Sequence, residues 1–123
     1  MTQPDTSRKL RLGAFIMATG HHIAAWRHPG SQADAGVNID HYIELAQTAE
    51  RGLFDQVFVA DSPGVWHKGD RESFSRQGRL SHFEPVTLWA ALSAVTKHIG
   101  FVATASTTCL LYTSPSPRDQ RGS

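Results

Sequence analysis

The amino-acid sequence predicts an α/β fold made of parallel βαβ units, as in a (β/α)8 barrel or a doubly wound sheet. Predicted elements alternate in the order strand, helix, strand, helix, strand, which requires parallel strands with crossover helices. Each predicted helix leads almost directly into a strand, whereas about twenty residues follow each of the first two strands, far above the usual two to six. Long loops gathered at one edge of a parallel sheet indicate that the carboxyl ends of its strands form the functional edge.

The first predicted strand is the apolar run from Leu10 to Met17, whose lack of alternation is typical of a strand covered on both faces. Residues 1–9 before it are expected to be a flexible N-terminus. The mostly basic residues 8–11 also permit a signal-peptide interpretation, but Gly13 interrupts the apolar run, which is about the minimum length for such a segment. A buried strand is preferred, and no segment approaches the ~20 apolar residues of a membrane span.

The first helix is expected to begin after Asn38, a good N-cap residue, with Asp40 in its first turn. Gly52 is the expected left-handed stop, and a buried strand over residues 54–60 follows at once. Helical spacing predicts one apolar face for this helix, made of Ile39, Tyr42, Ile43, Ala46, Ala49 and Leu53.

The second helix is expected to open at Glu84, with Pro85 at the first helical position, where a missing N–H costs nothing. The third strand, residues 99–105, follows it directly. The predicted buried face of this helix consists of Leu88, Trp89, Leu92 and Val95.

Composition excludes several functional classes. The chain has 123 residues, 40% of them hydrophobic, with twelve basic and eleven acidic side chains and a net charge of +1. This composition predicts a globular protein. It shows no excess of positive charge of the kind that binds nucleic acid or an anionic membrane surface. The single cysteine, Cys109, rules out an internal disulfide and fits a reducing compartment, so a cytoplasmic location is expected.

Common cofactor and metal motifs are absent from the sequence. There is no G-x-G-x-x-G turn and no Walker loop, which argues against a dinucleotide-binding domain. Seven histidines are present, but the adjacent pair His21 and His22 points in opposite directions in an extended chain, and no H-E-x-x-H occurs. We therefore expect no metal site.

Polar residues follow two of the predicted strands. Asp61 ends the second strand, either as a turn residue before Ser62 and Pro63 or as a polar contact for a ligand at the sheet edge. Thr104 opens a hydroxyl cluster at the end of the third strand, although threonines are also ordinary strand residues. Trp26, in the first long loop, could line a ligand pocket or anchor its own loop.

Three blocks of sequence now point to a family. GAFIMATGHHIAAWRHP, HYIELAQTAERGLFDQVFVAD and EPVTLWAALSAVTKHIGFVATASTT resemble, in this order, the amino-terminal third of bacterial-luciferase-like flavin monooxygenases, and most closely the nitrilotriacetate monooxygenase branch. The resemblance implies an incomplete (β/α)8 TIM barrel over residues 10–108. Residues 109–123 depart from the family pattern and resemble translated adaptor or vector sequence, so a non-family, artefactual tail is expected there.

The resemblance also implies a function. Family members use reduced FMN from a separate flavin reductase, together with O2, to oxygenate small substrates of aminopolycarboxylate, sulfone or alkane type, and are expected to be homo-oligomers. It implies that Asp61 and Thr104 contact the flavin, and that substrate is contacted by Met17, His21, His22 and Trp26; no catalytic residue is assigned. The truncated chain itself is expected to be inactive, because a barrel needs about 250 residues.

Two rival interpretations stay open at this stage. The chain could be a small α/β ligand-binding module without catalytic activity, complete as it stands. It could also be a coenzyme F420-dependent relative on the same fold, which the match to the nitrilotriacetate branch disfavours.

Overall fold

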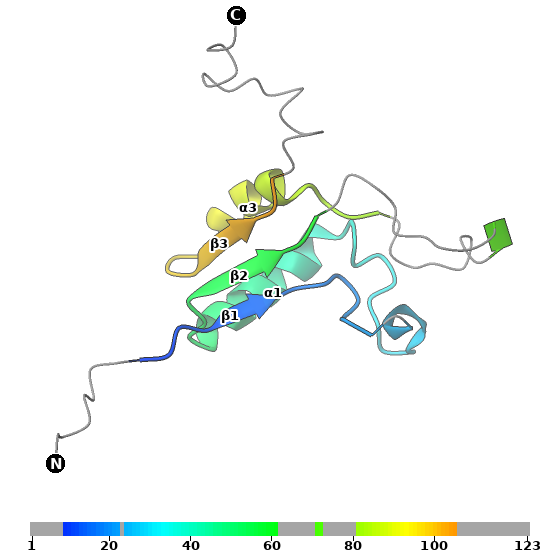
Figure 1. Ribbon diagram of the computed structural model, residues 1–123, viewed down its shortest axis with the longest axis horizontal. Coiled ribbons are helices and arrows are strands. Elements are labelled where there is room, and N and C mark those ends of the chain that lie inside the picture. Colours follow the sequence, from blue (N-terminus) through cyan, green and yellow to red (C-terminus); the bar gives the residue numbers. More distant parts are fainter. Residues whose placement is uncertain (1–8, 23, 62–70, 73–80, 106–123) are drawn as a thin grey trace, which may run out of the picture.

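The computed structural model describes residues 9–22, 24–61, 71–72 and 81–105. These residues form a three-stranded sheet with helices packed on one of its faces (Figure 1). In chain order the elements are β1 (Gly13–Phe15), the short 3₁₀ helix η1 (Ala25–Arg27), α1 (Ile39–Arg51), β2 (Gln56–Val59), α3 (Pro85–Ser93) and β3 (Gly100–Ala103). The predicted order of strands and helices is confirmed.

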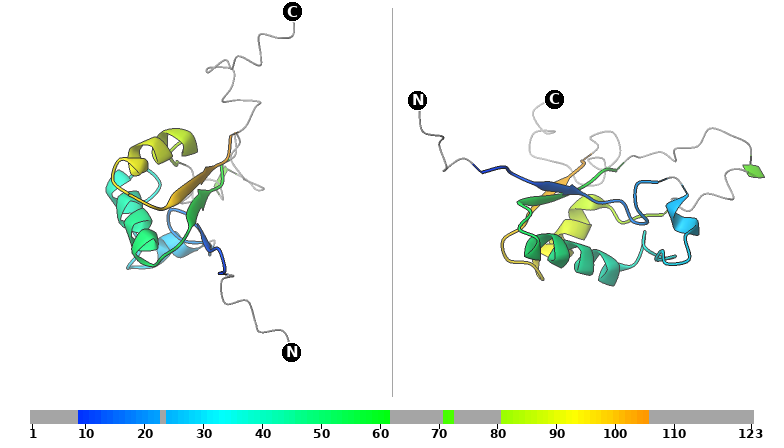
Figure 2. Two further views of the ribbon diagram at one scale, coloured as in Figure 1. Left: turned by 90° about the vertical axis from the view of Figure 1, so that its left-hand side faces the viewer. Right: turned by 90° about the horizontal axis from the view of Figure 1, so that it is seen from below.

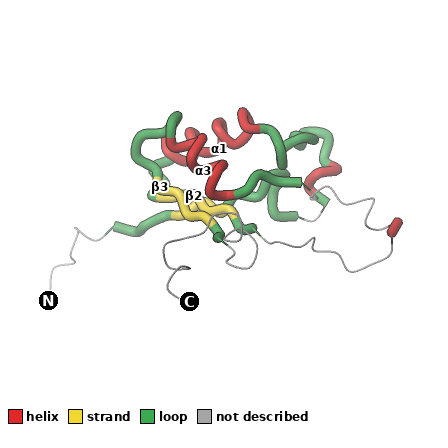
Figure 3. The backbone as a smooth tube through the Cα atoms, turned by 90° about the horizontal axis from the view of Figure 1, so that it is seen from above, coloured by secondary structure: helices red, strands yellow, loops and turns green. Residues whose placement is uncertain are grey.

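All strands of the sheet are parallel, and their spatial order β1-β2-β3 follows the chain. Both α1 and α3 cover the same face, as the side views in Figures 2 and 3 show. The register aligns Ala14 with Val57 and Val57 with Phe101, while Phe15 aligns with Phe58 and Phe58 with Val102. Because side chains alternate along a strand, these two rows belong to opposite faces of the sheet.

The core lies between the sheet and the two helices. Val57 in the central strand and Leu92 in α3 are completely buried there. Trp89 is also buried, as predicted; its indole Nε1 donates to the carbonyl oxygen of Val102 at 2.9 Å, and its ring lies 5.0 Å from that of Phe101. The other buried members of this cluster are Ile16, Tyr42, Ala46, Ala49, Val59, Leu88 and Ile99.

Both helix starts agree with the sequence prediction. The Asn38 side chain accepts from the backbone N–H of His41 at 3.2 Å and caps α1. The Glu84 carboxylate accepts from two backbone N–H groups at the start of α3, and Pro85 occupies the first turn. Each cap satisfies donors that the first helical turn cannot pair internally.

The end of α1 differs from the prediction. Gly52 has a right-handed φ of −76°, and the left-handed residue is Leu53, with φ of 59°. The chain reverses one residue later than expected because the N–H of Gly52 still bonds to the Thr48 carbonyl oxygen, continuing the helical pattern. Leu53 is 85% exposed, so its assignment to the buried face is also wrong.

Two other predicted core positions lie at the surface. Ile39 and Val95, at the start of α1 and just beyond α3, are exposed. Ile39 is the first residue of α1 and Val95 lies two residues past the last residue of α3, so both belong to helix ends and not to the packed middle turns.

The strands are shorter than predicted, and the first is not covered on both faces. Phe15 is 46% exposed, because within the described part of the chain no element covers the sheet face opposite the helices (Figure 3). An apolar run without alternation fits a strand whose second face lines the interior of a closed barrel. The described helices include none that is long and apolar enough to cross a membrane.

Candidate functional site

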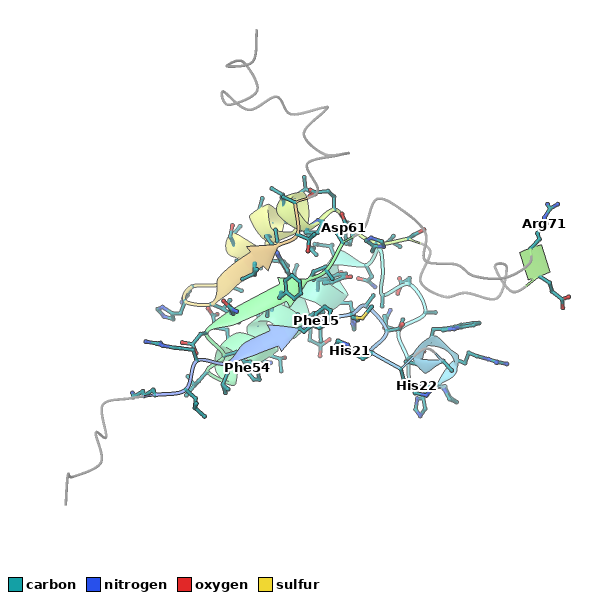
Figure 4. The ribbon with its side chains drawn as sticks, viewed as in Figure 1. Phe15, His21, His22, Phe54, Asp61 and Arg71 are labelled. Atoms are coloured by element: carbon teal, nitrogen blue, oxygen red, sulfur yellow. The ribbon has the colours of Figure 1, made fainter. Side chains whose placement is uncertain are left out.

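The carboxyl ends of β1, β2 and β3 lie at one edge of the sheet. Val59 in β2 pairs in register with Ala103 in β3, so Asp61 lies two residues past one strand and Thr104 one residue past its neighbour. Asp61 sits where the ribbon leaves β2 in Figure 4. The structure thus brings the two predicted flavin contacts to the same edge, while their role in binding stays a prediction.

Asp61 is paired with a histidine from the segment that precedes α3. The Nε2 atom of His82 lies 2.8 Å from Oδ1 of Asp61, and the carboxylate accepts this hydrogen bond. His82 is not among the site residues predicted from the sequence. The available signal was its position two residues before the Glu84 cap, since a helix that follows a strand in a βαβ unit begins at the strand's carboxyl edge.

A second carboxylate lies close to this pair. Burial acts to raise the pKa of Glu84, and the negative charge of Asp61 acts in the same direction. The hydrogen bonds that Glu84 accepts from the N–H groups of Thr87 and Val86 outweigh both effects and hold its pKa below the ordinary 4.5. Both carboxylate oxygens of Glu84 are therefore engaged in capping α3.

Thr104 links the ends of two strands. Its hydroxyl donates to the carbonyl oxygen of Val59 over 3.3 Å, a long hydrogen bond, and the residue is half-buried. A hydroxyl that donates its hydrogen in this way still has lone pairs that can accept from a ligand.

His21, one of the predicted substrate contacts, contacts the end of β1. Its Nε2 donates to the carbonyl oxygen of Phe15 at 2.9 Å, and its ring meets the Phe15 ring edge-on at 4.7 Å (Figure 4). Met17 is half-buried and forms a turn with Gly20, whose N–H donates to the Met17 carbonyl oxygen at 2.8 Å. His21 and Met17 therefore belong to the end of β1.

His22 and Trp26 have different surroundings. His22 faces a shallow hollow of about 590 Å³ in the loop after β1, where its Nδ1 accepts from the N–H of Ala24. Trp26 is half-buried within the same loop, with the Arg27 guanidinium 5.8 Å above its ring, and does not line the hollow. The four predicted substrate contacts thus divide into one pair at the end of β1 and one pair in the loop that follows.

The sheet face opposite the helices carries a row of apolar side chains. Phe15, Phe58 and Val102 align across the three strands, and the rings of Phe15 and Phe58 are 5.0 Å apart. Phe15 and Val102 are exposed on this face. In a closed (β/α)8 barrel this face lines the interior, next to the edge at which the strands end.

The described residues include no cluster of side chains that could hold a metal ion. They contain no group of three or more histidine, cysteine, aspartate or glutamate side chains placed to hold an ion. Asp61 and His82 lack a third such ligand in the part of the chain that the structure covers.

Comparison with known proteins identifies the family of the chain. The profile of the luciferase-like monooxygenase family matches residues 14–114. N-acetyl-S-(2-succino)cysteine monooxygenase from Bacillus subtilis (strain 168) is 50% identical over 105 residues, which are 84% of this chain and 22% of that protein. Nitrilotriacetate monooxygenase component A from Aminobacter aminovorans is 37% identical over 108 residues, which are 83% of this chain and 24% of that protein.

A solved structure shows the same fold. Riboflavin lyase (RcaE), crystallised with modified FMN and its substrate riboflavin, superposes with a TM-score of 0.68 at 31% identity, over 83% of this chain and 24% of that one. This chain therefore spans about a quarter of the length of the proteins that it matches. The chain belongs to the luciferase-like monooxygenase family.

Proposed function

We propose that this chain is the amino-terminal part of a two-component, FMNH2-dependent monooxygenase, which transfers one oxygen atom of O2 to a small organic substrate. Residues 10–108 would form the barrel portion and residues 109–123 a tail outside it. The observation that carries this proposal is the family match together with the edge at which Asp61, His82 and Thr104 gather. The family supports a flavin, and FMN in the riboflavin lyase structure supports the particular cofactor.

The residues present fit such a cofactor. An isoalloxazine ring is flat and apolar on its faces and carries hydrogen-bonding atoms at its edges. Phe15, Phe58 and Val102 supply an apolar surface, and the adjoining edge supplies a carboxylate, an imidazole and a hydroxyl. Of these, Asp61 and Thr104 are the proposed flavin-binding residues, Asp61 through its pair with His82.

Reduced flavin supplies the two electrons that let one atom of O2 enter the substrate while the other leaves as water. The chain's own residues would bind the cofactor, orient it and keep water away from it. The apolar row of Phe15, Phe58 and Val102 would keep water away, because a dry site suppresses reaction of the reduced cofactor without oxidation of the substrate. Substrate is proposed to approach past His21 and Met17 at the end of β1, with His22 and Trp26 further out in the loop.

A separate flavin reductase supplies the reduced FMN, and the complete protein is a homo-oligomer of the cytoplasm. The 123-residue chain alone is proposed to be inactive, since the three parallel strands of its described part cannot close a barrel and the apolar row stays exposed there.

A chimera tests the proposal. Residues 10–108 replace the matching segment of the Bacillus subtilis relative, whose 50% identity over 105 residues favours a correctly closed barrel. We expect saturable FMN binding, measured by quenching of flavin fluorescence, and reductase-dependent oxidation of the substrate that the relative's name states. The outcome that contradicts the proposal is a folded chimera that binds no FMN. Micromolar FMN binding by the 123-residue chain with a cooperative melt would instead favour an independent ligand-binding module.

A further inference from the structure

The carboxylate of Asp61 is already engaged in the structure. It accepts a hydrogen bond from Nε2 of His82 at 2.8 Å, and its side chain is only 14% exposed, whereas the His82 side chain is 41% exposed. A ligand that reaches this edge therefore meets the imidazole before the carboxylate. The arrangement therefore differs from the one expected from the sequence, in which Asp61 itself contacts the ligand.

The segment that carries His82 is fixed on both sides. On one side, the backbone of Ser81 passes so close to Gly36 that a Cβ at Gly36 would collide with the Ser81 carbonyl oxygen. On the other side, the Phe83 ring packs edge-on against Tyr42, with ring centroids 5.8 Å apart. A side chain held by its neighbours and by a hydrogen-bonding partner is preorganised, which is what a binding residue requires.

We propose that His82 contacts the bound flavin and that Asp61 is its positioning residue. The assignment rests on the proposed function of the preceding section. Because a carboxylate can only accept, Nε2 of His82 carries the hydrogen, and in the tautomer that this bond selects Nδ1 is the acceptor nitrogen. An N–H group at the edge of an isoalloxazine ring is a donor of the matching kind.

Two other roles of the pair lead to different results. If Asp61 contacted the flavin directly, the loss of its charge would weaken binding whether or not His82 is present. If the pair only joined the loop after β2 to the start of α3, its loss would lower stability and leave the affinity for FMN unchanged.

A double-mutant cycle in the chimera separates these roles, with FMN affinity from fluorescence quenching and thermal melting as readouts. The variants are Asp61→Asn, His82→Gln and both together. In His82→Gln the amide can take the place of Nε2 and keep the bond to Asp61, while the acceptor at Nδ1 is lost. In His82→Asn the amide takes the place of Nδ1 instead. Asp55→Asn is the matched control, because Asp55 lies at the amino edge of β2 and pairs with Arg11.

We expect His82→Gln and Asp61→Asn each to weaken FMN binding about tenfold, in line with the loss of one hydrogen bond. The double variant should be no weaker than His82→Gln, and His82→Asn should recover part of the affinity. Asp55→Asn should leave the affinity unchanged.

Three results would overturn the assignment. Unchanged affinity in a folded His82→Gln chimera would show that the imidazole does not contact the flavin. A further loss in the double variant would show that Asp61 contacts the flavin itself. Failure of the unmutated chimera to bind FMN would remove the proposed function, and this assignment with it.

Discussion

Glu50, in the last turn of α1, accepts a hydrogen bond from the backbone N–H of Ile99 at 3.1 Å, across a sequence separation of 49 residues. The same oxygen, Oε1, also accepts from the N–H groups of Lys97 and His98. These three donors precede β3, where the sheet offers them no partner. One carboxylate therefore fixes the turn between α3 and β3 against the end of α1.

This arrangement predicts a pH-dependent stability. The hydrogen bonds from the backbone at His98 and Lys97 hold the pKa of Glu50 below its ordinary 4.5. A depressed folded-state pKa means that the contribution is present above pH 4.5 and is lost as the pH falls through the folded value. We expect Glu50→Gln to lower the melting temperature of the chimera at pH 7 and to have little effect in acid. Glu44→Gln, at an exposed position of the same helix, is the control; an equal effect at both pH values would contradict the prediction.

Two apolar residues near the end of α3 should differ sharply in their contribution to stability. Leu92 is completely buried and Val95 is 41% exposed. We expect Leu92→Ala to lower the free energy of unfolding by about 2–5 kcal/mol, through lost burial and a residual cavity. Val95→Ala should cost less than about 0.5 kcal/mol. Urea denaturation of the two chimeras measures the difference, and similar costs would show that Val95 is covered in the closed barrel.

The sequence was sufficient to predict the order of the elements and the start of each helix, because these depend on local signals. Asn38 and Glu84 are caps that need only the first turn of their own helix. Whether a side chain is buried depends instead on the neighbouring elements that pack against it. Val95 lies past the end of α3 and is exposed, and Phe15 belongs to an apolar strand whose second face is bare in the described residues.

The candidate site was predicted only in part. Asp61 and Thr104 could be placed at one edge because parallel strands end together. His82 could not be paired with Asp61, because the pairing joins residues 21 apart through a loop with no periodic signal. The separation of His22 and Trp26 from the strand ends likewise results from how the first long loop folds.

The left-handed residue after α1 offers a test of backbone strain. Leu53 adopts φ of 59°, which costs a branched side chain about 1–2 kcal/mol relative to glycine, and it is 85% exposed. We expect Leu53→Gly to raise the free energy of unfolding by up to about 1 kcal/mol, after the greater flexibility of glycine in the unfolded chain is allowed for. Gly52→Ala should be tolerated, since Gly52 is right-handed. A severe loss in Gly52→Ala would instead support the left-handed glycine that the sequence predicts.

The bare sheet face should make the isolated chain self-associate. Phe15 is 46% exposed and aligns with Phe58, so an apolar patch and an open strand lie together. We expect the 123-residue chain to bind the dye ANS and to form oligomers in sedimentation experiments, and Phe15→Lys to reduce both. Val37→Lys, which removes an equally exposed apolar residue from a loop, should have little effect. A monomeric chain that binds no dye would contradict this expectation.

Gly36 should be required for the position of His82. A methyl group at Gly36 would collide with the carbonyl oxygen of Ser81, and because that atom is backbone, the segment before α3 has to shift. We expect Gly36→Ala to weaken FMN binding in the chimera about as much as His82→Gln does, since the imidazole would leave its place beside Asp61. Gly30→Ala is the control from the same loop, because its methyl group would meet only the movable His28 side chain. If Gly36→Ala lowers the melting temperature but leaves FMN affinity intact, the backbone contact serves stability alone, and His82 must be held at the edge by Asp61.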